Sequence, residues 1–400
     1  MAQLLPLAPD RFPATDRAVK PRILILSFSA IRSDPRVMRQ VRLLEGKAHL
    51  TIAGFGAAPD VDCDFAEIVR GPATSVQRTL WAAKLLLGGF ESYIWNRPEV
   101  QSGLQVLSGR QFDLIIANDV AALPLALKLA DGAPVLADAH EYSPKEFDDR
   151  FLWRLLFGRY QDYLCRTYLP RASAVTTVCE GISNAYRDNY GVLPEVVLNA
   201  PAFFSIHPSA VTPGKVRMVH HGAALRARHL ELMIDLMASL DDRFALDLML
   251  VESDARYMRE LRERAASNDR IRFVEPVRME DIPNRINEYD VGLYLLPPAN
   301  FNHEYALPNK LFEFIQARLA IAIGPSPEMA RIVRAYSLGV IAEGFKPHDM
   351  ATALSTMTDS QLATFKRSTD KAAEQLSFEE SGRVLLARVN SLVGPGLSVQ

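Results

Sequence analysis

Short apolar runs alternate along the chain with segments in which apolar residues recur every three or four positions. The apolar run at 23–27 is followed by helical spacing at 36–45 and by a second apolar run at 50–54. A strand, a helix and a strand in this order form the unit of a parallel sheet. The same patterns predict further strands at 114–117, 135–137 and 174–178, and further helices at 121–130 and 151–169.

This alternation stops at residues 200–215, which are rich in proline and have no apolar period, and then restarts. The second half has predicted strands at 217–220, 245–251, 271–274, 291–295 and 320–323, and predicted helices at 230–240, 257–266, 282–287 and 310–318. The pattern predicts an α/β protein with two Rossmann-like, doubly wound parallel-sheet domains that face each other across a cleft.

The expected boundaries follow from these patterns. The first domain should cover 21–205 and the second 206–375, and a helical pattern within 376–400 should pack back on the first domain. Residues 1–20 contain prolines and have no basic stretch before their short apolar segment, so we expect a disordered leader and no signal peptide.

Composition narrows the functional class. The chain has 400 residues, of which 48% are hydrophobic and 23% charged, as in soluble multi-domain proteins. A net charge of −2 provides no basic field for nucleic acid. Three widely spaced cysteines argue for free thiols in a reducing compartment, so we expect a cytoplasmic protein.

The segment that begins at Pro308 combines a helix start, a cation and a carboxylate. Pro308 suits the first turn of a helix, which should leave the N–H groups of Asn309, Lys310 and Leu311 free to bind phosphate. Glu313, about one turn further, can accept hydrogen bonds from vicinal hydroxyls. Diphosphate beside ribose describes a nucleotide sugar; the alternative is an ordinary amphipathic helix with a solvated lysine.

Loops that follow other strands carry further candidates, because ligands bind doubly wound sheets at the carboxyl ends of the strands. Gly222 would let the backbone approach a phosphate, and Arg228 can bond two phosphate oxygens. The alternative is a helix start with exposed arginines. In the first half, Ser29 and Arg32 follow the first strand, and Asp34 is expected to cap the next helix with Pro35 at its first position.

A histidine lies between two carboxylates after the strand at 135–137. The segment Asp138–Tyr142 contains His140 and Glu141, and such a cluster can supply a general base or contact the hydroxyls of a sugar. The alternative is a structural histidine.

Taken together, these segments resemble the glycosyltransferases of the GT-B fold, in particular the retaining family four, over residues 22–392. The resemblance rests on Ser33–Val37, Asp138–Tyr142, Thr177–Ser183, Val197–Pro201, His221–Arg228, Pro308–Phe314, Ala320–Gly324 and Pro327–Ala330. It implies a nucleoside-diphosphate sugar donor in the second domain and a glycan, lipid-linked or small-molecule acceptor in the first, where Ser29 and Arg32 are the acceptor-side candidates.

The resemblance also implies roles for single residues. Arg228 and Lys310 would hold the diphosphate, Glu313 the ribose, and His140 with Glu141 would form the catalytic pair. In the family a first glutamate often lies eight positions before the second, and here Tyr305 holds that place with Glu304 beside it.

The predicted function is a hexosyltransferase that retains configuration and needs neither a metal ion nor a cofactor. The leaving diphosphate would be neutralised by two cations and a helix dipole. Two alternatives remain open: a nucleotide-sugar epimerase of the same architecture, and a non-catalytic module that binds a nucleotide.

Two segments, 80–95 and 150–171, combine aromatic residues with basic ones. Such a mixture suits helices that lie in a membrane interface. Because neither segment is long and apolar enough to span a bilayer, we expect peripheral contact with the inner face of the cytoplasmic membrane. The alternative is that both segments are core helices with arginines on their wet faces.

Overall fold

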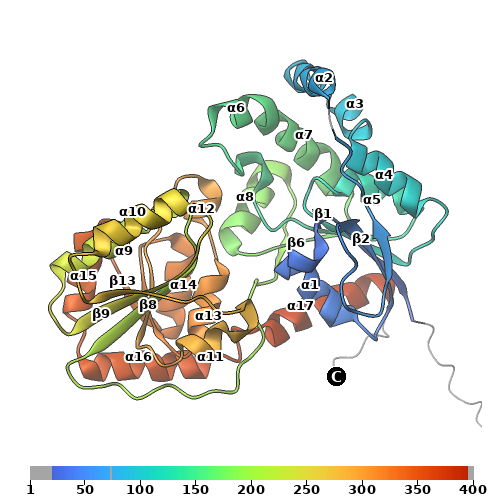
Figure 1. The fold of residues 1–400 in the computed structure, drawn as a ribbon. Coiled ribbons are helices and arrows are strands. Elements are labelled where there is room, and N and C mark those ends of the chain that lie inside the picture. Colours follow the sequence, from blue (N-terminus) through green and yellow to red (C-terminus); the bar gives the residue numbers. More distant parts are fainter. Residues whose placement is uncertain (1–19, 73, 395–400) are drawn as a thin grey trace, which may run out of the picture.

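The structure is a computed structural model that describes residues 20–72 and 74–394. The predicted leader therefore lies, except for Lys20, outside the described residues. Two lobes, each built on a parallel sheet with helices on both faces, lie side by side (Figure 1). This arrangement confirms the predicted α/β fold with two Rossmann-like domains.

The sheet of the N-terminal domain has the strand order β3-β2-β1-β4-β5-β6-β7, and its neighbouring strands pair in parallel. The order reverses between β1 and β4, where doubly wound sheets bind ligands. The strands are β1 (Arg22–Ala30), β2 (His49–Phe55), β3 (Asp64–Glu67), β4 (Leu114–Asn118), β5 (Val135–Asp138), β6 (Ala174–Thr177) and β7 (Glu195–Val196).

Helices cover both faces of this sheet, which explains why its central strands are continuous apolar runs. They are α1 (Pro35–Leu44), α2 (Ser75–Leu86), α3 (Phe90–Trp95), α4 (Pro98–Leu107), α5 (Leu123–Leu129), α6 (Phe151–Trp153), a π-helical segment (Arg154–Gly158), α7 (Arg159–Tyr168) and α8 (Glu180–Tyr190). Short 3-10 turns lie at Ile31–Ser33, Ser143–Lys145 and Leu169–Arg171.

The sheet of the C-terminal domain has the order β10-β9-β8-β11-β12-β13, again with parallel pairs. Its strands are β8 (Val216–Ala223), β9 (Phe244–Val251), β10 (Ile271–Val274), β11 (Val291–Tyr294), β12 (Ala320–Ile323) and β13 (Gly339–Ile341). Its order reverses between β8 and β11.

The helices of the second half are α9 (Glu231–Leu236), α10 (Ala255–Ala265), α11 (Ile282–Ile286), α12 (Phe301–Glu304), α13 (Asn309–Gln316), α14 (Pro327–Tyr336), α15 (Pro347–Ser355), α16 (Asp359–Ala372) and α17 (Phe378–Val393). Short 3-10 turns lie at Arg226–Arg228, Met237–Ser239 and Met279–Asp281. No helix or strand occurs between β7 and β8, so this stretch links the domains as an extended chain.

Helix α17 returns to the N-terminal domain. Leu385, Leu386 and Val389 join a buried cluster with residues of β1 and α1 such as Ile23 and Val37. Figure 1 shows α17 beside α1, although the two helices lie at opposite ends of the described sequence. The N-terminal core is therefore built from both ends of the sequence.

Candidate functional site

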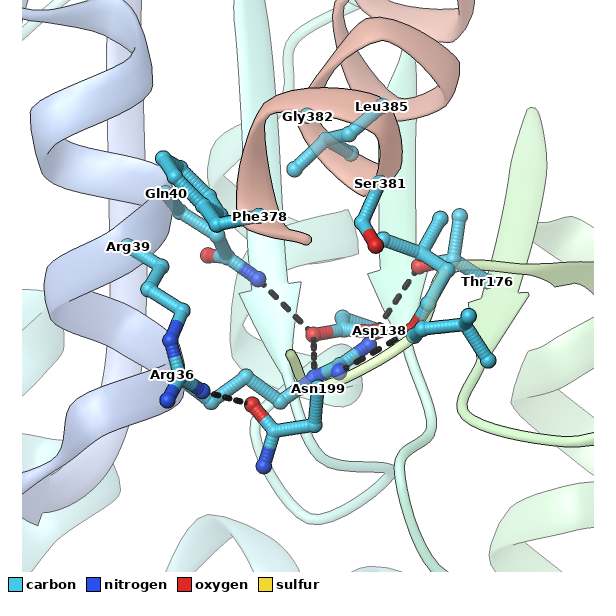
Figure 2. A pocket seen from close by; sticks show the side chains of 12 residues that line it. Arg36, Arg39, Gln40, Asp138, Thr176, Asn199, Phe378, Ser381, Gly382 and Leu385 are labelled. Atoms are coloured by element: carbon cyan, nitrogen blue, oxygen red, sulfur yellow. Dashed lines mark hydrogen bonds and ion pairs between the residues drawn. The ribbon is translucent and has the colours of Figure 1, made fainter. Parts of the chain in front are cut away.

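Helix α1 begins as the sequence predicts and brings an arginine under the end of β5. The carboxylate of Asp34 accepts hydrogen bonds from the N–H groups of Arg36 (3.1 Å) and Val37 (3.2 Å), and Pro35 is the first helical residue. The guanidinium of Arg36 then donates two 2.6 Å hydrogen bonds to the carboxylate of Asp138 (Figure 2).

The carboxylate of Asp138 is fully occupied by this network. It also accepts from Gln40 (2.8 Å) and Thr176 (2.8 Å), and its residue is only 1% exposed. The hollow beside it, under α17, has a volume of about 20 Å³, enough for about one water molecule. The sequence analysis grouped Asp138 with His140 and Glu141. In the structure the carboxylate of Asp138 instead binds Arg36, so Asp138 positions the loop that follows β5.

That loop places His140 beside an aspartate that the sequence analysis did not single out. Because β4 and β5 are neighbours, their carboxyl ends bring Nδ1 of His140 within 3.5 Å of Oδ1 of Asp119. Burial is the largest single influence and lowers the pKa of His140, but Asp119, Asp138 and Glu141 together outweigh it, so the pKa lies above its ordinary value. The pair can hold a proton at the imidazole.

Carboxylates crowd this part of the N-terminal domain. Burial raises the pKa of Glu141, and burial together with Glu141 and Asp119 raises the pKa of Glu146 to about 7. The backbone carbonyl of Glu141 accepts a 2.7 Å hydrogen bond from the hydroxyl of Tyr186, which fixes the loop. Protonated and ionised acids are thus both available near His140 at neutral pH.

In the C-terminal domain, a glycine and two cations meet at the end of β8. A Cβ atom on Gly222 would lie 2.5 Å from Cε of Lys310 and 3.4 Å from Nη1 of Arg228, and the φ of Gly222 is +126°. Only glycine therefore fits between these side chains without strain. Burial and the charge of Arg228 lower the pKa of Lys310 to about 8, so the two cations repel each other and favour an anion between them.

Helix α13 starts next to these cations. In the described structure no side chain caps it, so its first N–H groups remain available at the positive end of the helix dipole. Pro308 is the N-cap, and Asn309 and Lys310 are the first two helical residues. The N–H of Leu311 already donates to the carbonyl of Pro308 at 3.1 Å, so it is less free than the N–H groups of Asn309 and Lys310, and its contact with a phosphate stays a prediction.

Glu313 lies one turn further and is buried. On one side is His221 of the same domain, and on the other is Arg39 of the N-terminal domain. Oε2 of Glu313 is 3.3 Å from Nε2 of His221, but the two atoms do not form a hydrogen bond. Burial raises the pKa of Glu313 to about 7, with Lys310 and Arg39 opposing it. Burial and Lys310 keep His221 neutral by lowering its pKa far below its ordinary value.

A chain of polar side chains joins the two domains at this point. Arg39 of α1 donates to Asn199 of the linker, and Asn199 donates to Asn309 of α13 at 2.9 Å. A groove of about 520 Å³ lies between the domains here and is lined by Arg39, Glu313 and the exposed Arg32, among others. Arg32, predicted for the acceptor side, therefore shares a groove with the predicted ribose ligand.

Other predicted residues lie as follows. The hydroxyls of Ser29 and Ser27 are 2.8 Å apart at the end of β1. Glu304 is exposed on α12. The ring of Tyr305 packs on Gly181 of the other domain, where a Cβ would lie 2.0 Å from the ring, so Tyr305 takes part in interdomain packing. Its role toward a donor sugar stays a prediction.

Three residues near the predicted site were missed in the sequence: Asp119, His221 and Arg39. A signal for Asp119 existed, because it comes two residues after the apolar run at 114–117, where strand-end residues are expected. His221 lies in a quoted motif but was given no role. Arg39 is a helical residue that only the approach of the two domains brings to Glu313, so no local pattern could have identified it.

The described residues contain no group of three or more side chains arranged as metal ligands, and none of their helices is long and apolar enough to cross a membrane. All three cysteines are free.

The sequence matches no family model and no curated protein. Its fold, in contrast, matches many solved structures. HepE of Anabaena in complex with UDP-glucose superposes with a TM-score of 0.67 at 14% identity, over 93% of this chain and 100% of that chain. Sucrose-phosphate synthase from Thermosynechococcus elongatus gives 0.63 at 15% identity (93% and 99% covered).

A third neighbour is WaaG, a glycosyltransferase involved in lipopolysaccharide biosynthesis, with a TM-score of 0.62 at 12% identity over 93% of this chain and 100% of that chain. At these identities the likeness concerns the fold. The two facing parallel sheets and the whole-length superpositions show that this chain has the fold of the GT-B glycosyltransferases, as its motifs predict.

Proposed function

We propose that the protein is a glycosyltransferase that moves a hexose from a nucleoside-diphosphate sugar to an acceptor with retention of configuration. The observation that carries the proposal is the meeting of Gly222, Arg228 and Lys310 at the uncapped start of α13. A desolvated lysine, an arginine beside it, a helix dipole and a glycine without a side chain form a site for a diphosphate.

The same groups would act on the leaving group. As the bond from the sugar to the diphosphate breaks, negative charge grows on the phosphate oxygens. Arg228, Lys310 and the first N–H groups of α13 would stabilise this charge in the transition state. This arrangement is the reason to propose catalysis without a divalent ion, which a chelator titration of the purified enzyme tests.

Glu313 lies one helical turn from Lys310, so a ribose next to the proposed diphosphate would come near it. Its ionised carboxylate would accept hydrogen bonds from the two ribose hydroxyls, with His221 beside it. Since HepE was solved with UDP-glucose, UDP-glucose is the first donor to test.

The N-terminal domain would supply the acceptor side. His140 follows β5 with its Nδ1 3.5 Å from Oδ1 of Asp119, and we propose that it contacts the transferred sugar. We propose a glycan, a lipid-linked glycoside or a small molecule as the acceptor, and a cytoplasmic site of action.

Calorimetry with UDP tests the donor site. Lys310→Ala and Glu313→Gln should each weaken UDP binding by about one to two decades, because each removes a charge-assisted hydrogen bond. Two exposed residues of the same domain provide matched controls, Lys215→Ala and Glu343→Gln, which should bind UDP as the wild type does. Unchanged affinity in both site variants would remove α13 from the donor site.

Product analysis separates the alternatives. A transferase releases UDP from UDP-glucose in proportion to glycosylated acceptor. An epimerase converts the nucleotide sugar to an isomer with no acceptor present, and a non-catalytic module binds UDP without turning over any donor.

A further inference from the structure

The N-terminal domain exposes apolar side chains on two adjoining helices, far from the sheet. These are Val76, Leu80 and Leu87 on α2 and its C-cap, and Phe151, Leu152 and Leu155 on α6 and the π-helical segment; we call them the α2–α6 patch. They are between 47% and 87% exposed. Helix α2 packs against the π-helical segment, and both lie at the same end of the domain (Figure 1).

The spacing of the exposed residues on α2 places them on one face of the helix. Val76, Leu80 and Leu87 are four and seven residues apart, so they form one stripe. The opposite face carries Leu85, which is buried, and Trp81, whose ring contacts Tyr93 edge-on at 6.3 Å. Helix α2 thus has two apolar faces, one packed on the domain and one uncovered by any described segment.

The residues that the sequence predicts for membrane contact therefore divide into a buried group and an exposed group. Phe90, Tyr93, Ile94 and Tyr160 are buried, as the alternative interpretation of core helices expects. The exposed stripe of α2 and the side chains of 151–155 are not explained by that interpretation. Single exposed apolar residues are common, but a group of this size needs a partner.

The charge around the patch indicates which partner. The segments 74–89 and 147–159 carry five cations and two carboxylates, whereas the whole chain has a net charge of −2. Arg150 and Arg154 lie over the rings of Phe147 and Phe151, with guanidinium-to-centroid distances of 4.9 and 5.9 Å. One of the two carboxylates, Asp149, accepts a hydrogen bond from Asn300 of the other domain.

We propose that the α2–α6 patch docks on the surface of a bilayer that contains anionic lipid. The apolar side chains would enter the boundary between headgroups and acyl chains, and the cations would meet the lipid phosphates. An amphipathic surface of this kind lies on the membrane and does not span it, which agrees with the absence of a long apolar helix among the described residues.

Continuity with the acceptor side supports a membrane over another partner. The chain runs from His140 through the turn Ser143–Lys145 directly into α6, so the patch begins within about ten residues of the predicted acceptor loop. A lipid-linked acceptor held in the same bilayer would reach His140 by lateral diffusion. This last step rests on the proposed function; the docking itself does not.

Vesicle flotation of the full chain tests the docking. The wild type should float with vesicles of phosphatidylcholine and phosphatidylglycerol at about 50 mM salt, and less at about 500 mM salt, because salt screens the charge contribution. Vesicles of phosphatidylcholine alone should recover much less protein.

Two variants divide the contributions. Leu80→Ser/Leu87→Ser and Arg150→Gln/Arg154→Gln should each lower partitioning about tenfold or more. The matched control, Leu225→Ser/Val251→Ser, changes two exposed apolar residues of the other domain and should float like the wild type. Circular dichroism on each variant checks that the protein is folded, and UDP calorimetry checks separately that the donor site is unchanged.

Three results would overturn the proposal: wild-type protein that does not float with anionic vesicles at low salt, an equal loss in the control variant, or a patch that joins two copies of the chain. Sedimentation velocity tests the last result. If the wild type is a dimer and the Leu80→Ser/Leu87→Ser variant is a monomer, the partner of the patch is a second copy of the chain.

Discussion

Asp138→Asn should destabilise the N-terminal domain strongly, although the asparagine side chain has nearly the same size and shape as the aspartate it replaces. The substitution removes the negative charge opposite Arg36, whose residue is only 8% exposed. A buried cation without its partner costs about 3–5 kcal/mol. Since domains are stable by about 5–15 kcal/mol, this loss would take a large part of the stability of the domain.

The assay can be restricted to the right domain. All three tryptophans, Trp81, Trp95 and Trp153, lie in the N-terminal domain, so their fluorescence in a urea titration follows the unfolding of that domain. The exposed pair Arg22 and Asp113 provides a matched control, with side chains 49% and 42% exposed. Asp113→Asn should cost only about 0–1 kcal/mol.

The pH dependence of the difference has a definite sign. Although burial opposes its ionisation, Arg36 keeps the pKa of Asp138 below its ordinary value. The stability that the carboxylate provides is therefore present above about pH 4, the ordinary pKa, and is lost as the pH falls toward the lower pKa of the folded protein. Wild type and Asp138→Asn should converge in acid.

The double variant Arg36→Met/Asp138→Asn should recover part of the loss, because it leaves no charge buried alone. A loss below about 1 kcal/mol in Asp138→Asn at neutral pH, or an equal loss in Asp113→Asn, would show that the buried pair does not act as described.

Three further predictions concern the proposed site. Gly222→Ala should lower UDP affinity about tenfold or more in calorimetry, because its Cβ would displace Lys310, whereas Gly214→Ala, also at positive φ but with open space around it, should not. Affinity for UDP-glucose should rise through about pH 7 as Glu313 ionises and fall above about pH 8 as Lys310 loses its proton, and a flat profile would contradict both assignments. His140→Ala should reduce kcat far more than UDP affinity, and turnover within about twofold of wild type would make His140 a structural residue.

The sequence predicted the central strands well because their apolar runs are buried on both faces by helices. The central strand β12 at 320–323 matches the predicted bounds, and so does the edge strand β10 at 271–274. The edge strands β3, β7 and β13 were missed, since they are too short to show a period and, unlike β12, contain no apolar run of more than two residues. The segment 151–169 reads as one helix in sequence, and nothing in its apolar spacing marks the π-helical turn within it.

The candidate site was predictable only where it is local. Asn309, Lys310 and Glu313 lie on one helix, so their spacing indicated their chemistry. The partners of these residues come from elsewhere: His221 from β8 and Arg39 from the other domain. The ion pair between Arg36 and Asp138 could not be predicted either, because the two residues are 102 positions apart in the sequence. Contacts of this range depend on the packed fold, which a local pattern does not encode.

The return of α17 sets an order for folding during synthesis. The face of α1 and β1 that Leu385, Leu386 and Val389 cover cannot be completed until the ribosome has translated about 180 residues beyond β7. At about 5–20 residues per second this takes roughly ten to forty seconds. During that time the nascent N-terminal domain presents an open apolar groove, so the C-terminal domain can finish folding before the domain that was translated first.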